Sequence, residues 1–324
     1  MRTERGALTS FFQEIKKGGG RHYPQDETAQ ADAELNEFIH ILEQEGVKVR
    51  RPEIFDFSQE YCTPDWRSRG WCSASPRDVM LVIGDQIIET PSAWRARYFE
   101  IFVYRELLQE YFEKGAKWVS TPKPMLRDSL FDYRYQVPKV GPPQKWVVNE
   151  SEIVFDAADF VRCGRDIFVA RAQTTNDKGI EWLERHLGND YRIHRVESRS
   201  PYPMHIDTTF VPLAPGKLLI NPEYVDRNKL PSVVKSWDIL EAPPADPTKS
   251  PYNSFSSSWL SINVLMLDEE RVFVEASQTT LASRLRDWGF KPIFCPFATM
   301  ANYGGAFHCA TLDIRRRGTL QSYF

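Results

Sequence analysis

The sequence has no long hydrophobic run and no large excess of charge of one sign. No apolar stretch approaches the roughly 18 residues that a membrane-spanning helix needs. The formal net charge is -3 and the pI is near 6.1, so composition gives no reason to expect nucleic acid or an anionic membrane as a partner. We therefore expect a chain that binds neither.

Cysteine is scarce and scattered, and no two cysteines form a CxxC pair. An odd number of isolated thiols favours neither a zinc site nor a disulfide framework. The first residues, Met1 to Arg5, also lack the apolar core of a secretion signal. We expect free thiols, no bound metal and a cytoplasmic location. The five thiols are Cys62, Cys72, Cys163, Cys295 and Cys309.

What is present is a recurring order of strand, strand, helix and strand. Of the 324 residues, 42% are hydrophobic and 13% aromatic, which is enough for a sizeable core. Hydrophobic periodicity predicts four copies of this unit, and therefore an α/β fold within a single domain, 1–324. The predicted ranges are 79–83, 87–89, 92–114 and 117–120; 153–160, 166–170, 177–187 and 191–196; 206–213, 217–220, 225–237 and 239–240; and 260–267, 271–274, 279–288 and 291–294.

A fifth unit is predicted to be split between the two ends of the chain. It would combine a helix at 26–46, a short strand at 47–49 and a C-terminal strand at 307–314. Such closure would remove the exposed edges of an open array. One strand of this unit is not found, because residues 1–25 are polar and glycine-rich, so we expect the split unit to be incomplete.

Histidine is also rare, which shortens the search for catalytic groups. Four of the six histidines are expected to be surface or packed residues: His22, His40, His186 and His194. His308 adjoins Cys309, but neighbours on a strand point to opposite faces. His205 and Asp207 are two residues apart at the start of a predicted strand and would share one face.

The prediction that His205 is catalytic is supported by reactive residues at the starts of the corresponding strands in the other units. A closed array would gather these residues around its axis, where a thiol, a histidine and a carboxylate can act as nucleophile, base and orienting group. Additional buried carboxylates require a cationic partner. A guanidinium, with its planar fork of N–H donors, fits best. The corresponding residues are Asp78, Asp156, Asp159 and Cys309.

Several motifs closely resemble those of the glycine amidinotransferase family in the guanidine-modifying superfamily, and more distantly those of the inosamine-phosphate amidinotransferases. They occur in the family's order and spacing from about residue 10 to the end. The motifs are Pro76-Arg77-Asp78, Phe155-Asp156-Ala157-Ala158-Asp159, Arg165-Asp166-Ile167-Phe168, Met204-His205-Ile206-Asp207, Ser256-Ser257 with Trp259-Leu260, and Gly304-Gly305-Ala306-Phe307-His308-Cys309 to Ser322-Tyr323.

The resemblance implies a five-bladed α/β propeller of ββαβ units and a set of site residues. Cys309 would be the nucleophile, His205 the general acid and base, and Asp156 its orienting partner. The substrate-binding residues it implies are Asp78 and Asp207 for the guanidinium, and Ser256 and Ser257 for the α-amino acid end of the donor. Met204, beside His205, and Tyr224 are further candidates for substrate binding. Asp159 is expected to be structural.

Two departures from the family are visible. Family members begin with a strand that carries a Glu-Trp-Asp motif, which this sequence lacks, so the first blade is expected to be incomplete. Tyr224 stands where glycine amidinotransferases carry an arginine that helps to hold the donor carboxylate. We expect another cation to hold the carboxylate, and Tyr202 with Tyr224 to reshape the pocket for the acceptor.

The resemblance implies transfer of the amidino group of L-arginine through Cys309 to an acceptor amine, with release of ornithine and no cofactor. The acceptor would be glycine or a larger amine from secondary metabolism. Members of the family often dimerise, so a homodimer is also expected. Three alternatives stay open: an arginine deiminase-like hydrolase with the same residues, a non-catalytic protein that binds guanidino compounds, and Cys309 as a core thiol.

Overall fold

The computed structural model describes residues 23–139, 141–143, 145–248, 257–318, 320 and 322–324. The chain forms two compact units. Unit 1 comprises Met1–Arg51 and Pro243–His308, and unit 2 comprises Pro52–Ala242 and Cys309–Phe324. No helix in the described part of the chain is long and apolar enough to span a membrane. The single domain stays a prediction.

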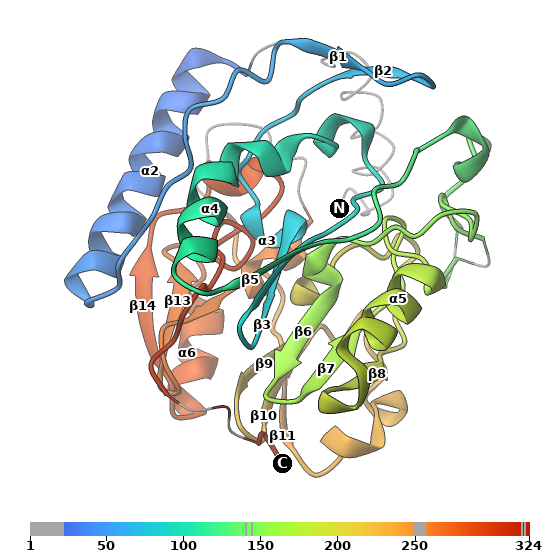
Figure 1. The fold of residues 1–324 in the computed structure, drawn as a ribbon. Coiled ribbons are helices and arrows are strands. Elements are labelled where there is room, and N and C mark those ends of the chain that lie inside the picture. The colour runs from blue at the N-terminus through green and yellow to red at the C-terminus, as the bar shows by residue number, and fades with distance from the viewer. Residues whose placement is uncertain (1–22, 140, 144, 249–256, 319, 321) are drawn as a thin grey trace. The chain divides into compact units, whose positions relative to one another are not determined.

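Unit 2 contains three sheets of the same topology (Figure 1). In each sheet the second strand lies in the middle, antiparallel to the first strand and parallel to the third. A hairpin of β1 (Glu60–Cys62) and β2 (Arg67–Arg69) precedes them. The sheets are β3 (Met80–Ile83), β4 (Gln86–Glu89) and β5 (Lys117–Ser120); β6 (Phe160–Cys163), β7 (Asp166–Val169) and β8 (Arg192–Arg195); and β9 (Phe210–Ala214), β10 (Lys217–Ile220) and β11 (Asp238–Glu241).

Helix α5 (Asp177–Leu187) connects the second and third strands of its unit, β7 and β8. The Asn176 side chain caps its first turn by accepting a hydrogen bond from the Gly179 N–H. A Cβ at Gly179 would lie 2.4 Å from the Val154 carbonyl oxygen, so only glycine permits this close approach. Ile180 and Leu183 then pack with residues of β3, β4 and β7 in one core cluster.

In the first and third units, the segments predicted to be helices differ from the prediction. In the first, residues 92–114 form two 3-10 helices, η1 (Arg95–Arg97) and η2 (Glu100–Tyr104), followed by α4 (Arg105–Glu113). In the third, the predicted helix at 225–237 is wrong, because the segment contains only the 3-10 turns η7 (Arg227–Lys229) and η8 (Ser232–Val234). Pro231 lacks an N–H, and Leu230 before it is extended, which interrupts the helix.

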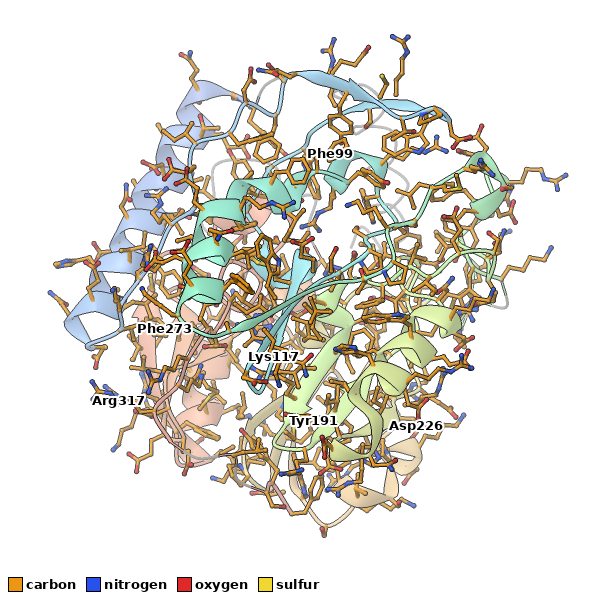
Figure 2. All side chains as sticks on the ribbon, viewed as in Figure 1. Phe99, Lys117, Tyr191, Asp226, Phe273 and Arg317 are labelled. Atoms are coloured by element: carbon orange, nitrogen blue, oxygen red, sulfur yellow. The ribbon has the colours of Figure 1, made fainter. Side chains whose placement is uncertain are left out.

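Unit 1 contains the fourth sheet and the predicted N-terminal helix. The strands are β12 (Leu265–Met266), β13 (Arg271–Glu275) and β14 (Lys291–Cys295), with α6 (Thr279–Asp287) before the last. Helix α2 (Gln25–Gln44) buries Phe38 against Phe273 and Phe297, with ring centroids 5.1 and 5.4 Å apart. Phe273 lies on β13 (Figure 2). Helix α2 therefore completes the aromatic core of this unit.

The two strands predicted for the split fifth unit are wrong. Residues 47–49 and 307–314 form no strand, and Phe307 to Ala310 is a turn. In the C-terminal segment the alternation has another cause, since Leu312 and Ile314 pack onto the cluster that contains Val79 of the first unit. Alternation here reflects burial of one side of a segment that pairs with no sheet. Residues 1–22 lie outside the described residues.

The first strands of three units begin later than predicted. Short 3-10 helices precede β6, β9 and β12: η4 (Ala157–Asp159), η6 (Ile206–Thr208) and η9 (Ser258–Ile262). A four-residue α-helical turn, α3 (Pro76–Val79), likewise precedes β3. Residues 154–160 are all buried, so their hydrophobic pattern does not separate the turn from the strand. The predicted site residues therefore lie on turns rather than on strands.

Candidate active site

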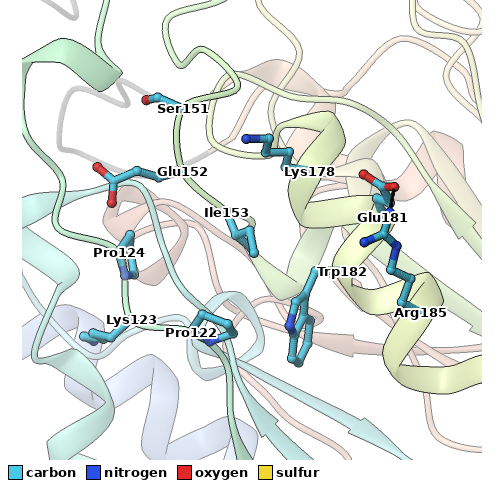
Figure 3. A pocket seen from close by; sticks show the side chains of 10 residues that line it. All are labelled: Pro122, Lys123, Pro124, Ser151, Glu152, Ile153, Lys178, Glu181, Trp182 and Arg185. Atoms are coloured by element: carbon cyan, nitrogen blue, oxygen red, sulfur yellow. Dashed lines mark hydrogen bonds and ion pairs between the residues drawn. The ribbon is translucent and has the colours of Figure 1, made fainter.

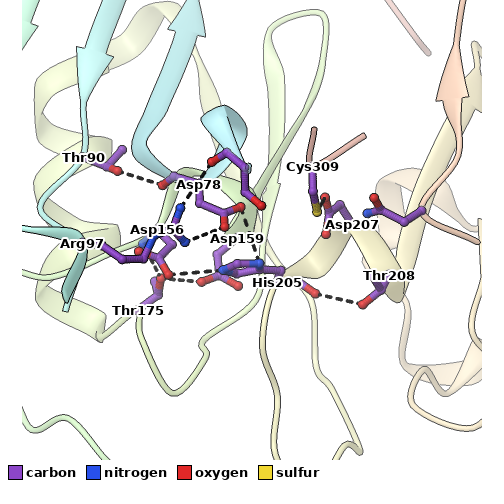
Figure 4. Close-up of polar contacts among 12 residues, drawn as sticks. Asp78, Thr90, Arg97, Asp156, Asp159, Thr175, His205, Asp207, Thr208 and Cys309 are labelled. Atoms are coloured by element: carbon purple, nitrogen blue, oxygen red, sulfur yellow. Dashed lines mark hydrogen bonds and ion pairs between the residues drawn. The ribbon is translucent and has the colours of Figure 1, made fainter. Parts of the chain in front are cut away.

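His205 lies between two carboxylates in unit 2 (Figure 4). Its Nε2 is 3.2 Å from Asp156 Oδ2, and its Nδ1 is 3.6 Å from Asp78 Oδ1. His205 immediately precedes η6 and has a φ of 49°, which is uncommon for a residue with a side chain and costs on the order of 1–3 kcal/mol. The backbone is held in this conformation where the ring meets Asp156 and Asp78.

The prediction that His205 and Asp207 share a strand face is wrong, because both belong to the 3-10 turn and its cap. A 3-10 helix has three residues per turn, so residues two apart diverge. Asp207 instead lies beside the thiol of Cys309, with 3.3 Å between Sγ and Oδ2. His205 also acts on this thiol: burial and the charge of Asp207 raise the pKa of Cys309, whereas His205 lowers it.

Arg97 and Glu100 complete the cluster, and sequence reasoning missed both. Arg97 Nη1 donates to Asp78 Oδ2 at 2.6 Å, and Nε and Nη2 donate to the Glu100 carboxylate at 2.6 and 2.8 Å. All three side chains are buried. Burial is the largest influence on Glu100 and raises its pKa to about 7, although Arg97 lowers it. The available signal was an Arg/Glu pair three residues apart in a segment otherwise rich in apolar side chains.

Asp156 and Asp159 are three residues apart and fully buried, but their pKa values are shifted in opposite directions. Burial opposes the charge of Asp156, yet His205 and Arg97 hold the pKa of this carboxyl below its usual range. Burial of Asp159 is not compensated in this way and raises its pKa to about 8. Asp159 Oδ2 accepts a hydrogen bond from Thr175, whose hydroxyl oxygen accepts one from the Asp156 backbone N–H. Asp159 therefore supports the turn that carries Asp156.

The protonation states of His205 and Cys309 follow from these surroundings. Burial acts to lower the pKa of His205, but the charge of Asp78 and the hydrogen bond to Asp156 raise it well above 6.5. Burial raises the pKa of the Cys309 thiol, and the charge of Asp207 raises it further. Without substrate, the site thus holds an imidazolium and a neutral thiol at neutral pH.

The cluster contains more buried acidic groups than cationic ones. The aspartates Asp78, Asp156 and Asp207 all lie there, whereas Arg97 divides its N–H donors between Asp78 and Glu100. Asp78 Oδ1 accepts no hydrogen bond from the described residues. Buried anions of this kind are stabilised by a cation with several N–H donors. The described residues contain no group of three or more side chains arranged to hold a metal ion.

The remaining predicted substrate residues are Met204, Tyr224, Ser256 and Ser257. Met204 and Tyr224 are half-buried. Near Tyr224, the Arg199 guanidinium donates to the carbonyls of Pro222 and Val225 at 2.9 and 3.1 Å. Ser257 belongs to unit 1, where its hydroxyl oxygen accepts from the Trp259 N–H at 3.2 Å. Ser256 lies outside the described residues.

A groove on the surface of unit 2 is separate from these groups (Figure 3). It has a volume of about 440 Å³, and none of the predicted catalytic residues lines it. Its walls come from the segment after β5 and from α5. The residues that line it are Pro122, Lys123, Pro124, Ser151, Glu152, Ile153, Lys178, Glu181, Trp182 and Arg185.

Comparisons with solved structures support the fold class. The chain resembles an amidinotransferase of saxitoxin biosynthesis from Microseira wollei, with 57% identity, a TM-score of 0.90, and 94% of this chain and 88% of that chain covered. It also resembles inosamine-phosphate amidinotransferase from Streptomyces griseus, with 34% identity, a TM-score of 0.85, and coverage of 93% and 84%. The predicted α/β propeller class is thereby confirmed.

Sequence comparison gives the same result. The L-arginine:L-lysine amidinotransferase of Pseudomonas savastanoi pv. phaseolicola is 49% identical over 316 residues, which are 97% of this chain and 86% of that protein. Mitochondrial glycine amidinotransferase of Gallus gallus is 46% identical over 321 residues, which are 97% of this chain and 75% of that protein. No family model matches the chain. On identity and coverage of this extent, the chain belongs to the amidinotransferase family.

Proposed function

We propose that this amidinotransferase takes the amidino group from L-arginine onto Cys309 and passes it to an acceptor amine. One observation carries the proposal: Cys309, His205 and the carboxylates of Asp78, Asp156 and Asp207 lie within one buried cluster of unit 2. The excess of carboxylates suits a guanidinium substrate, and the thiol beside a histidine suits covalent catalysis.

In the first half-reaction, Asp78 and Asp207 hold the guanidinium of the donor beside Cys309. The positive charge of the bound donor lowers the pKa of the thiol and favours the thiolate, which attacks the guanidinium carbon. The bond from this carbon to the side-chain nitrogen of the donor then breaks. His205, which is protonated in the resting site, donates its proton to the departing nitrogen of ornithine. The proton of the thiol leaves to solvent when the thiolate forms, and the proton of His205 goes to the departing amine, which leaves the imidazole neutral.

In the second half-reaction, an acceptor amine replaces ornithine and attacks the amidino carbon on Cys309. His205 takes the proton that the amine loses and becomes the imidazolium again. The carbon–sulfur bond breaks, and the released thiolate takes up a proton from solvent to regenerate the thiol. Asp156 keeps the imidazole oriented through both steps, since its carboxylate contacts Nε2. These steps require neither a metal nor an organic cofactor.

Two features bear on the identity of the substrates. The names of the similar proteins include lysine, glycine and a saxitoxin pathway, so acceptors differ among these relatives. We propose glycine or a larger amine of secondary metabolism as the acceptor here, with Tyr224 and Tyr202 shaping its site. Arg199, whose guanidinium lies along the Pro222–Val225 segment, is our candidate for the cation that replaces the family's arginine at Tyr224.

Product analysis distinguishes transfer from hydrolysis. The protein is incubated with arginine alone and then with arginine and each of a panel of amines that includes glycine and lysine. With an amine, the expected products are ornithine in repeated turnover and a new guanidino compound. With arginine alone, no more than one ornithine per chain is expected. Citrulline would instead support the hydrolase alternative, and absence of any product would support the binding protein. Cys309→Ala is the control and should form no product; retained activity would make Cys309 a core thiol.

A homodimer and a cytoplasmic location stay predictions. Size-exclusion chromatography with light scattering gives the mass of the protein in solution. A mass of one chain at all concentrations tested would exclude the homodimer.

A further inference from the structure

The segment that carries the nucleophile has no regular secondary structure. From Cys309 to Phe324, none of the described residues belongs to a helix or strand. A strand would fix its residues through a ladder of backbone hydrogen bonds, but this segment has no such ladder. Side-chain contacts after Cys309 therefore contribute to its position within unit 2.

One ion pair connects this segment to the turn that carries a substrate carboxylate. Arg77 Nη2 lies 2.8 Å from Asp313 Oδ2 and 3.5 Å from Thr311 Oγ1. The two ionised side chains are only 12% and 25% exposed. Arg77 directly precedes Asp78 on α3, and Asp313 is four residues after Cys309. The pair thus joins two short segments, each carrying a residue of the cluster.

Apolar contacts of the two neighbouring residues accompany the ion pair. Leu312 and Ile314, the neighbours of Asp313, pack against the cluster that contains Val79, the second residue after Arg77. Packing favours this docking but is non-directional, whereas a guanidinium–carboxylate contact also restricts sliding along the surface. The charged contact is the one that can set the position of the segment.

We propose that the Arg77–Asp313 pair is a positioning clamp that holds the Cys309 segment in register with the Asp78 turn. Its role in turnover rests on the proposed function of Cys309 and Asp78. Neither Arg77 nor Asp313 is required to touch the substrate. Loss of the pair lets the thiol move relative to the bound guanidinium, and a misplacement of about 1 Å can slow a positioned reaction about 100-fold.

Arg316 provides a matched control. It donates to the same carboxylate at 2.8 and 3.1 Å, but it lies three residues after Asp313 in the same segment. Its pair with Asp313 therefore does not connect the segment to the Asp78 turn. Arg316→Met removes one ion pair from Asp313 and leaves the proposed clamp in place.

The test compares Arg77→Met, Asp313→Asn, the double variant and Arg316→Met in the full chain. The first measurement is the rate at which saturating arginine, without acceptor, modifies Cys309, followed by peptide mass spectrometry. We expect each clamp variant to be about 10- to 100-fold slower and the double variant no slower than the slower single one. Arg316→Met should stay within about 2-fold of the wild type. The affinity for arginine should change less than the rate, because Arg97 still holds Asp78.

The second measurement is hydrogen–deuterium exchange of peptides within residues 309–318, which does not depend on any reaction. Exchange should be faster in the clamp variants than in the wild type or Arg316→Met. Arg77→Lys retains the positive charge and should recover part of the modification rate and part of the protection from exchange. It takes the place of Arg77→Met if that variant fails to fold. Three results would each overturn the clamp. They are equal effects of Arg77→Met and Arg316→Met on the modification rate, additive effects of the two single clamp variants on that rate, and faster exchange with an unchanged modification rate. Absence of modification in the wild type would instead defeat the proposed function, while exchange would still test the clamp.

Discussion

The buried cluster around His205 and the surface groove on α5 contain similar kinds of side chain in opposite settings. In the groove, Arg185 and Glu181 form an ion pair while their side chains remain 78% and 51% exposed. In the cluster, Asp78, Asp156 and Asp207 are all buried, as is Cys309 with 2% of its surface exposed. The groove is a hollow on the surface of unit 2, whereas the cluster holds the thiol, the histidine and the buried carboxylates.

The difference indicates that burial of charged groups is the observation that identifies the candidate active site. Exposed charges are solvated, and their pairs contribute about 0–1 kcal/mol. Buried charges are costly unless they are compensated, and groups with strongly shifted pKa values concentrate at functional sites. His205 and Cys309 both have such shifts, because each is buried next to carboxylates. Burial of several interacting ionisable groups, rather than the shape of the surface, distinguishes the cluster.

The largest effect is expected from His205→Asn, which removes the group proposed to exchange protons with the amines. Loss of a general acid and base typically costs about 10²- to 10⁴-fold in rate. Steady-state turnover with arginine and the preferred amine measures it. His194→Asn is the matched control, because His194 also contacts a carboxylate, Asp166, at 2.7 Å. A loss of similar size in His194→Asn would mean that the effect is not specific to the cluster.

A smaller loss is expected from Asp78→Asn, which removes one negative charge proposed to hold the guanidinium. Charged hydrogen bonds contribute about 1.5–3 kcal/mol, so kcat/KM for arginine should fall about 10- to 100-fold. Asp128→Asn breaks an exposed pair with Arg95 and provides the control. Asp78 is not a donor-binding group if Asp78→Asn and Asp128→Asn have the same kcat/KM.

Asp159→Asn should change the pH dependence of stability. With a folded pKa of about 8 and an ordinary value of 3.8, Asp159 binds a proton on folding between these two pH values. The free energy of unfolding therefore falls as pH rises, by up to about 1.4 kcal/mol per pH unit from this group. An asparagine side chain at this position cannot titrate, so urea denaturation should show Asp159→Asn gaining stability relative to wild type from pH 5 to pH 8. A constant difference across that range would contradict a raised pKa.

The smallest effects are expected in the groove. Lys178→Ala and Glu181→Gln alter solvated side chains that line it, so the free energy of unfolding should change by no more than about 0.5 kcal/mol. Turnover should stay within about 2-fold of the wild type. If either variant slowed turnover as strongly as Asp78→Asn, the contrast between the cluster and the groove would be wrong.

Much of the regular structure could be predicted from periodicity alone. The ranges of β5, β10 and α5 match their predictions. The apolar residues of α5 recur at the spacing of one helix face, whereas β5 and β10 are short apolar runs next to polar residues. The helix predicted at 225–237 failed because Pro231 overrode a weak helical pattern. The C-terminal strand failed because Leu312 and Ile314 alternate toward a core without pairing with a sheet.

The site was harder to predict in its details than in its composition. The residues of the cluster were identified from their positions before successive strands, and unit 2 brings Asp78, Asp156, His205, Asp207 and Cys309 together. Their directions were not predictable, since a 3-10 turn and the positive φ of His205 decide them. Arg97 was missed because its partner Asp78 lies 19 positions earlier and outside any helical spacing.

The most direct test of the central proposal is mass spectrometry of the protein after exposure to arginine without an acceptor. The account predicts a mass increase of one amidino group on the peptide that contains Cys309, release of ornithine in equal amount, and loss of the adduct when the acceptor amine is added. Cys309→Ala should gain no mass. An unmodified Cys309 peptide, with ornithine or citrulline nonetheless released, would contradict a covalent intermediate on this thiol.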